Sequence, residues 1–196
     1  LNPYDAVLDG SYDAFVATLR ERVAALRQGP PLAGPLVDCG AMTMPGQLDI
    51  IEGLVDDALA RGARALVGGQ RNTELGGQYF APTLLVDVDH SMRIMREETF
   101  GPAIPLMEYE DFDEALDLAN DSPFALGASL MSSDPQRIQR FFEEVRAGTI
   151  WINDPLTDNF AGPFGGMKMT GGGRELGQEG LDQFYEVKHV HWDVEG

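Results

Sequence analysis

Apolar residues recur along the chain at two spacings, and each spacing predicts a different element. Between Tyr12 and Gln28 they fall four, four and three positions apart, which places them on one face of an α-helix. A second helix is predicted to begin at Pro45, because proline suits a first helical turn. Two more are predicted behind Asp111 and Asp134, since an aspartate before a helical pattern accepts hydrogen bonds from the first backbone amides.

Short apolar runs lie between these helices and predict strands. The predicted strands cover residues 65–67, 80–88, 103–109, 128–131 and 149–152. Strands that alternate with helices form βαβ units. The predicted fold class is therefore α/β: an open, twisted, mostly parallel sheet with helices on both faces.

The pattern changes near the C-terminus. Residues 162–180 are rich in glycine, which favours loops and tight turns. Residues 183–194 then alternate as a long extended segment whose phase slips once, as a β-bulge would cause. A lone terminal strand leaves its backbone edge unpaired. We therefore expect residues 1–181 to form one domain and residues 182–196 to form a strand that pairs with another subunit in a homo-oligomer.

Composition excludes several classes of partner. The chain has 196 residues with 32 acidic and 14 basic ones, for a formal net charge of −18. Nucleic acids and anionic membranes need a basic surface, so neither is an expected partner. No apolar run approaches the roughly 20 residues that span a bilayer, and the first residues do not form a signal peptide. A single cysteine, Cys39, favours a reducing compartment, and we expect a cytoplasmic protein.

A metal site is not expected. His189 and His191 lie two positions apart and would point to one face of a strand. No third ligand accompanies them in the sequence, because His90 is distant and Cys39 has no zinc-type spacing.

Four blocks of residues, in this order and at these spacings, resemble the aldehyde dehydrogenase superfamily. They are Glu97-Glu98-Thr99-Phe100-Gly101-Pro102; Asn120-Asp121-Ser122-Pro123-Phe124; Ala147-Gly148-Thr149-Ile150-Trp151-Ile152-Asn153; and Pro163-Phe164-Gly165-Gly166-Met167-Lys168, followed by the Gly171–Gly177 run and Glu186-Val187-Lys188. The resemblance extends over essentially the whole chain. It implies the C-terminal half of the catalytic region of an NAD(P)-dependent oxidoreductase.

The first block implies cofactor binding. By resemblance, Glu98 holds the nicotinamide ribose hydroxyls of NAD or NADP and Phe100 packs beside the nicotinamide. A carboxylate suits two neighbouring hydroxyls because it accepts two hydrogen bonds at once. The alternative from the residues alone is that Glu98 caps or pairs locally and Phe100 belongs to the core.

Other matched positions imply a substrate pocket. Phe164 resembles an aromatic residue of the family's substrate funnel, and Leu126 closes the second block. The preceding loop, which varies within the family, brings three more pocket candidates: Thr157, Asp158 and Phe160. The alternative for Phe164 is a packed turn residue.

The glycine-rich run does not follow a strand-to-helix phosphate motif, so it is not interpreted as a phosphate loop. By resemblance it lies near a subunit interface, where Arg174 and Glu186 form a pair that links the interface to the active site. The alternative is two surface charges, which contribute under about 1 kcal/mol.

The family's mechanism implies residues that this sequence lacks. A cysteine thiolate attacks the aldehyde carbon, a hydride passes to NAD(P)+, and water activated by a glutamate hydrolyses the thioester to the carboxylic acid. Neither the nucleophile segment nor the glycine turn of the dinucleotide site occurs here, so no catalytic residue is predicted in this chain. Cys39 is interpreted as an incidental thiol, because Asp38 and apolar neighbours disfavour a thiolate.

Three hypotheses follow. The chain is part of a full-length aldehyde dehydrogenase whose N-terminal half supplies the nucleophile and most of the cofactor site. Alternatively it is a stand-alone, non-catalytic binding or assembly module, or one half of a split enzyme. The particular aldehyde, the choice between NAD and NADP, and the choice between dimer and tetramer stay open.

Overall fold

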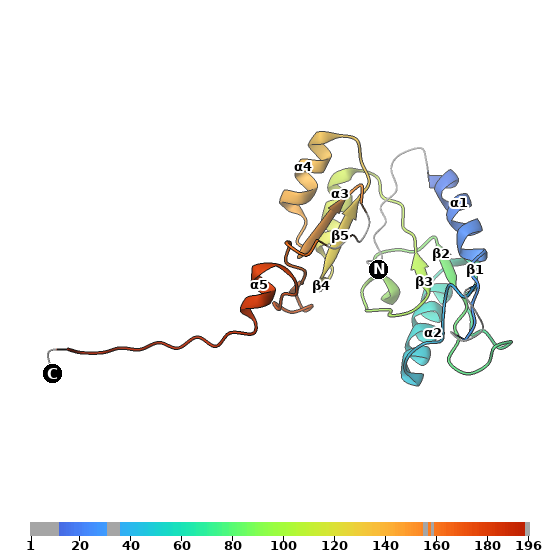
Figure 1. Cartoon of the computed structure of the whole chain (residues 1–196). Helices are drawn as coiled ribbons and strands as arrows, with labels where there is room; N and C mark the ends of the chain where they lie inside the picture. Colours follow the sequence, from blue (N-terminus) through green and yellow to red (C-terminus); the bar gives the residue numbers. More distant parts are fainter. Residues whose placement is uncertain (1–11, 31–35, 155–156, 158, 195–196) are drawn as a thin grey trace. The chain divides into compact units, whose positions relative to one another are not determined.

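The computed structural model describes residues 12–30, 36–154, 157 and 159–194. These residues form two compact units, Leu1–Ser122 and Pro123–Gly196, and each is considered by itself. Figure 1 shows their helices and strands.

The first unit is built around a three-stranded sheet. Its elements are α1 (Tyr12–Ala24), α2 (Pro45–Ala60), β1 (Arg64–Val67), β2 (Thr83–Val86), the 3-10 turn η2 (Arg93–Met95), β3 (Ala103–Pro105) and α3 (Phe112–Asn120). The strand order is β1-β2-β3, with β2 antiparallel to β1 and parallel to β3. The central strand β2 is buried along its whole length.

Alternate residues of β2 enter two cores. Leu84 and Val86 pack with Val23 of α1 on one face of the sheet. Leu85 points to the opposite face and packs with Ile51 of α2. The sheet of this unit is therefore covered by a helix on each face, as expected from the sequence.

Helix α2 provides most of the larger core. Its fully buried side chains recur at helical spacing and pack against the segments that surround β2 and η2. They are Ile51, Leu54, Val55 and Ala58, and their partners include Phe80, Ile94 and Met95. This packing holds η2, which leads directly into the Glu97–Pro102 block, against the helix.

The second unit contains two small sheets. Its elements are β4 (Phe124–Ala125), β5 (Gly127–Leu130), α4 (Pro135–Glu144), β6 (Thr149–Ile152), β7 (Met167–Lys168) and α5 (Gly177–Asp182). Strands β5 and β6 pair in parallel and are joined by α4, so they form a βαβ unit. Strands β4 and β7 form a short antiparallel pair.

The sheet prediction is partly wrong. The α/β class is confirmed, but the described residues form three small open sheets rather than one mostly parallel sheet. Strands β1 and β2 are antiparallel because no helix connects them. Instead the chain turns back through glycines with positive φ, such as Gly68 at 67° and Gly76 at 65°.

Local predictions at the helix starts are confirmed. The Asp111 side chain accepts a hydrogen bond from the Glu114 amide at 2.9 Å, and Asp134 accepts one from the Gln136 amide at 2.8 Å. Pro45 occupies the first turn of α2. The first helix is shorter than predicted, since it ends at Ala24 rather than near Gln28.

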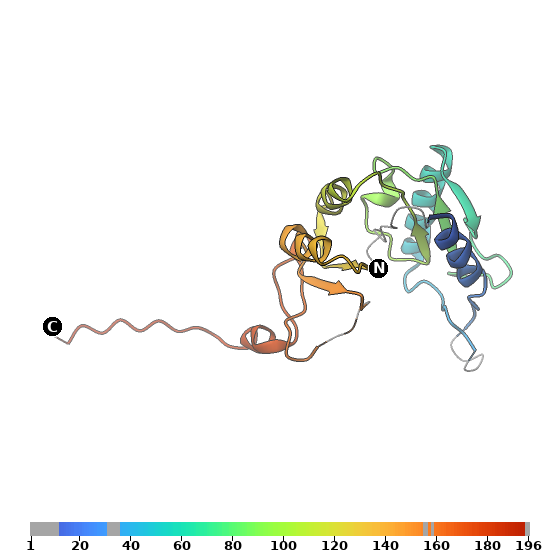
Figure 2. The same cartoon turned by 90° about the horizontal axis from the view of Figure 1, so that it is seen from above.

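The C-terminal segment is extended but does not form a strand. Residues 185–194 continue beyond α5 without regular pairing in both views (Figures 1 and 2). The predicted bulge is therefore not formed in the isolated chain. Large apolar side chains stay exposed along this segment, with Val187 at 99% and Trp192 at 80%.

One glycine of the second unit permits a very close backbone approach. A Cβ added at Gly148 would lie 1.7 Å from the carbonyl oxygen of Gly165. We predict that Gly148→Ala lowers the free energy of unfolding by about 2–3 kcal/mol, because backbone rather than a flexible side chain must move. Gly172→Ala is the matched control, since a Cβ there meets nothing within 4 Å. Equal urea-unfolding midpoints for the two variants would contradict this.

Candidate functional site

The Glu97–Pro102 block forms an exposed loop between η2 and β3. Glu98 is exposed, and its carboxylate forms no hydrogen bond or ion pair with other described residues. Phe100 is 72% exposed and has a φ of 37°. This left-handed value strains the backbone of any residue other than glycine. The alternative that Phe100 belongs to the core is therefore excluded in this chain. Strained, exposed residues are typical of binding sites.

An open pocket of about 840 Å³ lies beside this loop, entirely within the first unit. Glu98 and Phe100 line it together with apolar residues of β3 and of the segment before α2. The polar side chains of Thr43 and Gln47 also line it. A mostly apolar pocket with a few polar groups is the usual form of a small-molecule site.

Helix α2 supports the loop formed by Glu97–Pro102. The Gln47 side chain donates to the backbone carbonyl of Thr99 at 2.8 Å. Gly101 lies so close to the helix that an added Cβ would be 2.3 Å from the Ile51 side chain. The loop therefore rests directly on α2, with its exposed side chains turned toward the pocket lining.

Cys39 lies in the same pocket but lacks the surroundings of a nucleophile. Its Sγ donates only weakly, to the Gly40 carbonyl at 3.7 Å. The described lining contains no histidine, lysine or arginine that could stabilise a thiolate. These surroundings agree with the interpretation of Cys39 as an incidental thiol.

The segment that carries Cys39 is braced by an ion pair. Arg27 donates from Nε and Nη2 to the two carboxylate oxygens of Asp38 at 2.8 and 2.9 Å, and its backbone amide adds a third hydrogen bond at 3.0 Å. These hydrogen bonds lower the pKa of Asp38 from 3.8 to about 2.

The substrate-pocket candidates belong to the second unit. Leu126 and Phe160 are exposed, and Thr157 accepts a hydrogen bond from the Trp151 indole on its carbonyl at 2.9 Å. Phe164 is half-buried and exchanges two backbone hydrogen bonds of 2.7 Å with Glu175. Asp158 lies outside the described residues. The described candidates Leu126, Thr157, Phe160 and Phe164 therefore belong to the second unit, and Glu98 and Phe100 belong to the first.

Arg174 stabilises the glycine-rich turn. Its Nη1 donates to the carbonyls of Gly166 and Gly173, each at 2.8 Å. Glu186 is exposed in the extended segment after α5 and forms no ion pair with Arg174 in the described part of the chain. The pairing of these two residues stays a prediction for an assembled oligomer.

No group of three or more histidine, cysteine, aspartate or glutamate side chains in the described ranges could hold a metal ion.

Within those ranges, no helix is both long enough and apolar enough to cross a bilayer.

Sequence reasoning missed the residues that support the loop. The Gln47 contact joins positions far apart in the chain, so no local pattern could have indicated it. The ion pair between Arg93 and Glu97 has the i,i+4 spacing of stabilising pairs on helices, and this signal was available in the sequence.

Comparison with known proteins finds one family. Residues 6–190 match the model of the aldehyde dehydrogenase family. The chain is 36% identical over 189 residues to glutarate-semialdehyde dehydrogenase of Pseudomonas aeruginosa and 37% identical over 189 residues to the NADP(+) succinate-semialdehyde dehydrogenase of Escherichia coli. Both alignments cover 94% of this chain but 38% of the relative, so the chain spans little more than a third of these proteins.

Solved structures of aldehyde dehydrogenases are also similar to this chain. Betaine aldehyde dehydrogenase of Staphylococcus aureus, solved in complex with NAD+, has a TM-score of 0.86 at 36% identity and matches 94% of this chain and 37% of its own. Lactaldehyde dehydrogenase of Escherichia coli has a TM-score of 0.87 at 31% identity, covering 92% and 38%.

The low pKa of Asp38 predicts a pH-dependent contribution to stability. Because the folded-state pKa lies below the ordinary value, the brace stabilises the fold above about pH 4 and is lost as the pH falls toward 2. We predict that Asp38→Asn lowers the urea midpoint at pH 6 and that the two proteins converge near pH 2. The pair is exposed, so 1 M salt should reduce the difference. A difference that stays constant from pH 6 to pH 2 would contradict this assignment.

Proposed function

The chain belongs to the aldehyde dehydrogenase family, and from that premise we propose that it forms the C-terminal part of an NAD(P)-dependent enzyme that oxidises an aldehyde to a carboxylic acid. The family match covers most of the chain, whereas the chain covers little more than a third of its relatives. In this proposal the remaining part of the enzyme supplies the cysteine nucleophile, the glutamate base and most of the dinucleotide site.

One observation carries the assignment of the cofactor residues. Two glutamates are adjacent, but Glu97 is occupied by an ion pair with Arg93, whereas the Glu98 carboxylate makes no contact of this kind among described residues. Glu98 therefore keeps acceptors for two neighbouring hydroxyls, as a nicotinamide ribose presents them. Exposed Phe100 beside it offers an aromatic face to the nicotinamide ring.

These residues fit NAD or NADP as the hydride acceptor. When bound, the cofactor accepts the hydride that leaves the aldehyde carbon. The residues of this chain bind and orient it: Glu98 holds the ribose, Phe100 covers one side of the ring, and α2 supports both through the loop. The same proposal assigns no proton transfer to this chain.

The second unit supplies one wall of the substrate site in this proposal. Leu126, Thr157, Asp158, Phe160 and Phe164 are the proposed wall residues. The exposure of Phe160, at 86%, supports this role, because a large aromatic side chain left in solvent by one part of a protein is available to a ligand or to another segment. The aldehyde is a small molecule of the kind that the relatives' names specify, such as a semialdehyde.

The extended C-terminal segment is the proposed oligomer contact. Its exposed apolar residues alternate with polar ones, and residues 186–194 form no strand in the described part of the chain. Pairing with a strand of a second subunit would satisfy the backbone and cover the apolar side chains. Arg174 and Glu186 are proposed to lie at this interface.

We predict that Glu98→Gln in the complete enzyme lowers kcat/KM for NAD(P)+ about fivefold, because a hydrogen bond to a charged acceptor contributes roughly 1 kcal/mol more than one to a neutral acceptor. The KM for the aldehyde should stay near its original value. Glu74→Gln is the control, since Glu74 is an exposed carboxylate of the same unit. Steady-state kinetics measure both. If Glu98→Gln behaves like Glu74→Gln, the cofactor assignment is wrong.

Removal of residues 183–196 should convert the oligomer to smaller species. The expected cause is the loss of strand pairing between subunits, together with the loss of the apolar side chains that become buried in that interface. Light scattering coupled to size-exclusion chromatography measures the mass. An unchanged mass for the truncated protein would contradict the proposed interface.

A further inference from the structure

Both neighbours of Glu98 in the chain are fastened to the same helix. On the C-terminal side, the Thr99 carbonyl accepts the hydrogen bond from Gln47 of α2. On the N-terminal side, Glu97 is bound by Arg93, and the backbone amide of Arg93 donates to the Asp57 carboxylate of α2 at 3.1 Å. Glu98 itself has no such fastening among the described residues.

We propose that Arg93, anchored by Asp57, is a positioning residue that sets the place and direction of the Glu98 carboxylate. This inference rests on the proposed function of Glu98 in holding the cofactor ribose. It concerns a residue that acts through the loop and does not itself touch the cofactor.

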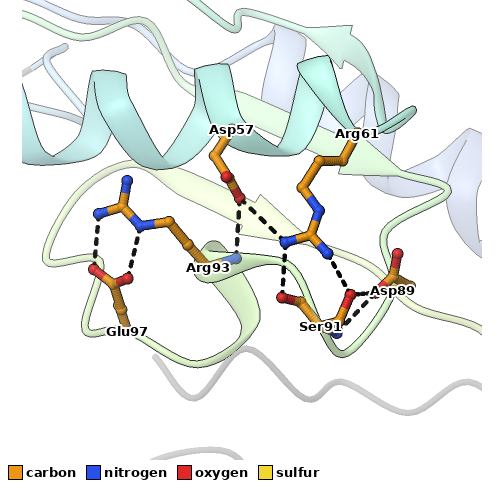
Figure 3. Close-up of polar contacts among 6 residues, drawn as sticks. All are labelled: Asp57, Arg61, Asp89, Ser91, Arg93 and Glu97. Carbon is orange, nitrogen blue, oxygen red and sulfur yellow. Dashed lines mark hydrogen bonds and ion pairs between the residues drawn. The ribbon is translucent and has the colours of Figure 1, made fainter.

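Arg93 binds Glu97 through its side chain and also through its main chain. Its Nε and Nη2 donate to the two carboxylate oxygens of Glu97 at 2.7 and 3.0 Å (Figure 3). Its carbonyl also accepts the Glu97 amide at 2.8 Å. A two-point guanidinium–carboxylate contact restricts orientation as well as distance. The backbone that enters Glu98 is therefore held at its preceding residue by both main chain and side chain.

Glu97 is charged at neutral pH, as an ordinary glutamate is. The hydrogen bonds from Arg93 lower the pKa of Glu97 further, so the carboxylate stays ionised to more acidic pH. The pair therefore persists under the conditions in which the enzyme would act.

The turn is anchored to α2 from two sides. On its apolar side, Ile94 and Met95 are buried in the core that α2 forms. On its polar side, Arg61, which caps the C-terminal end of α2, donates to the Ser91 carbonyl at 2.9 Å and to its hydroxyl at 2.5 Å, while Asp57 of α2 accepts from the Arg93 amide (Figure 3). The apolar contacts keep the turn folded, and the polar contacts set its rotation on the helix.

A half-exposed ion pair contributes little to global stability. The side chains of Arg93 and Glu97 are 49% and 48% exposed. Their loss is therefore expected to change the position of Glu98 without a large change in Tm. This separates a positioning role from a structural one.

The chain offers a closely matched control. Arg140 and Glu144 on α4 also form a two-point i,i+4 pair, at 2.7 and 3.1 Å, with 43% and 45% exposure. That pair lies in the other unit and is not adjacent to a proposed site residue. Arg93→Met and Arg140→Met therefore each remove a two-point i,i+4 pair, at two different places in the chain.

The kinetic test uses the complete enzyme that contains this chain. We expect Arg93→Met to raise the KM for NAD(P)+ on the order of tenfold, since small misplacements of a binding group have effects of this size or larger. Arg140→Met should match the unaltered enzyme, and both variants should keep its Tm. Asp57→Ala should raise the KM for NAD(P)+ in the same direction as Arg93→Met but by less. Asp57→Asn keeps an acceptor for the Arg93 amide, so its KM should stay close to that of the unaltered enzyme. Equal KM values for Arg93→Met and Arg140→Met would overturn the proposal.

A double-mutant cycle separates this inference from the proposed function. If Arg93 acts through Glu98, Arg93→Met should add no further increase in KM to Glu98→Gln. Additive effects would show that Arg93 acts by another route. A Glu98→Gln enzyme with unchanged cofactor kinetics would instead remove the proposed function itself.

Hydrogen exchange gives a readout that does not depend on catalysis. Arg93→Met should speed exchange at the amides of Arg96 and Glu97, which both donate to the Arg93 carbonyl, and Arg140→Met should leave them unchanged. Unchanged exchange at these amides in Arg93→Met would contradict the positioning role regardless of any activity.

Discussion

The packing of α2 against η2 and the loop that follows is the interaction on which the candidate site depends. The buried face of α2 packs against Ile94 and Met95, and this packing fixes the position of η2 along the helix. Polar contacts at two points along the helix then support the loop: Gln47 donates to the Thr99 carbonyl, and Asp57 accepts from the amide of Arg93, whose side chain binds Glu97. One amphipathic helix thus serves both the core of the first unit and the geometry of its exposed site.

The same constraint explains why a strained residue persists in the loop. Phe100 keeps a left-handed backbone and an exposed ring, which a relaxed loop would avoid. Gly101 follows it and passes directly over Ile51, where any side chain would collide with the helix. Because both neighbours of Glu98 are tethered, the backbone has little freedom to relieve the strain at Phe100. An exposed aromatic ring beside an uncommitted carboxylate is the feature that the family resemblance implies for the cofactor site.

Local features of the fold could be predicted from the sequence, because their causes are local. Asp111 and Asp134 mark helix starts by accepting hydrogen bonds from amides two or three positions away, and Pro45 marks one because its fixed φ suits a first helical turn. Strand pairing could not be predicted in the same way. The antiparallel pairing of β1 with β2 depends on how glycines reverse the chain between them, and alternation of apolar residues does not reveal it. The candidate site follows the same division: the motif points to Glu98 and Phe100, whose role stays a prediction, whereas the support from Gln47 and Asp57 depends on tertiary contacts.

The most direct measurement is a crystal structure of the complete enzyme with NAD+ or NADP+ bound. The account predicts that both oxygens of the Glu98 carboxylate lie within hydrogen-bonding distance, about 2.6–3.2 Å, of the two nicotinamide ribose hydroxyls. It also predicts that the contacts of Arg93 with Glu97 and of Asp57 with the Arg93 amide persist in the complex. A complex in which other residues hold the ribose while Glu98 points into solvent would contradict the central claim.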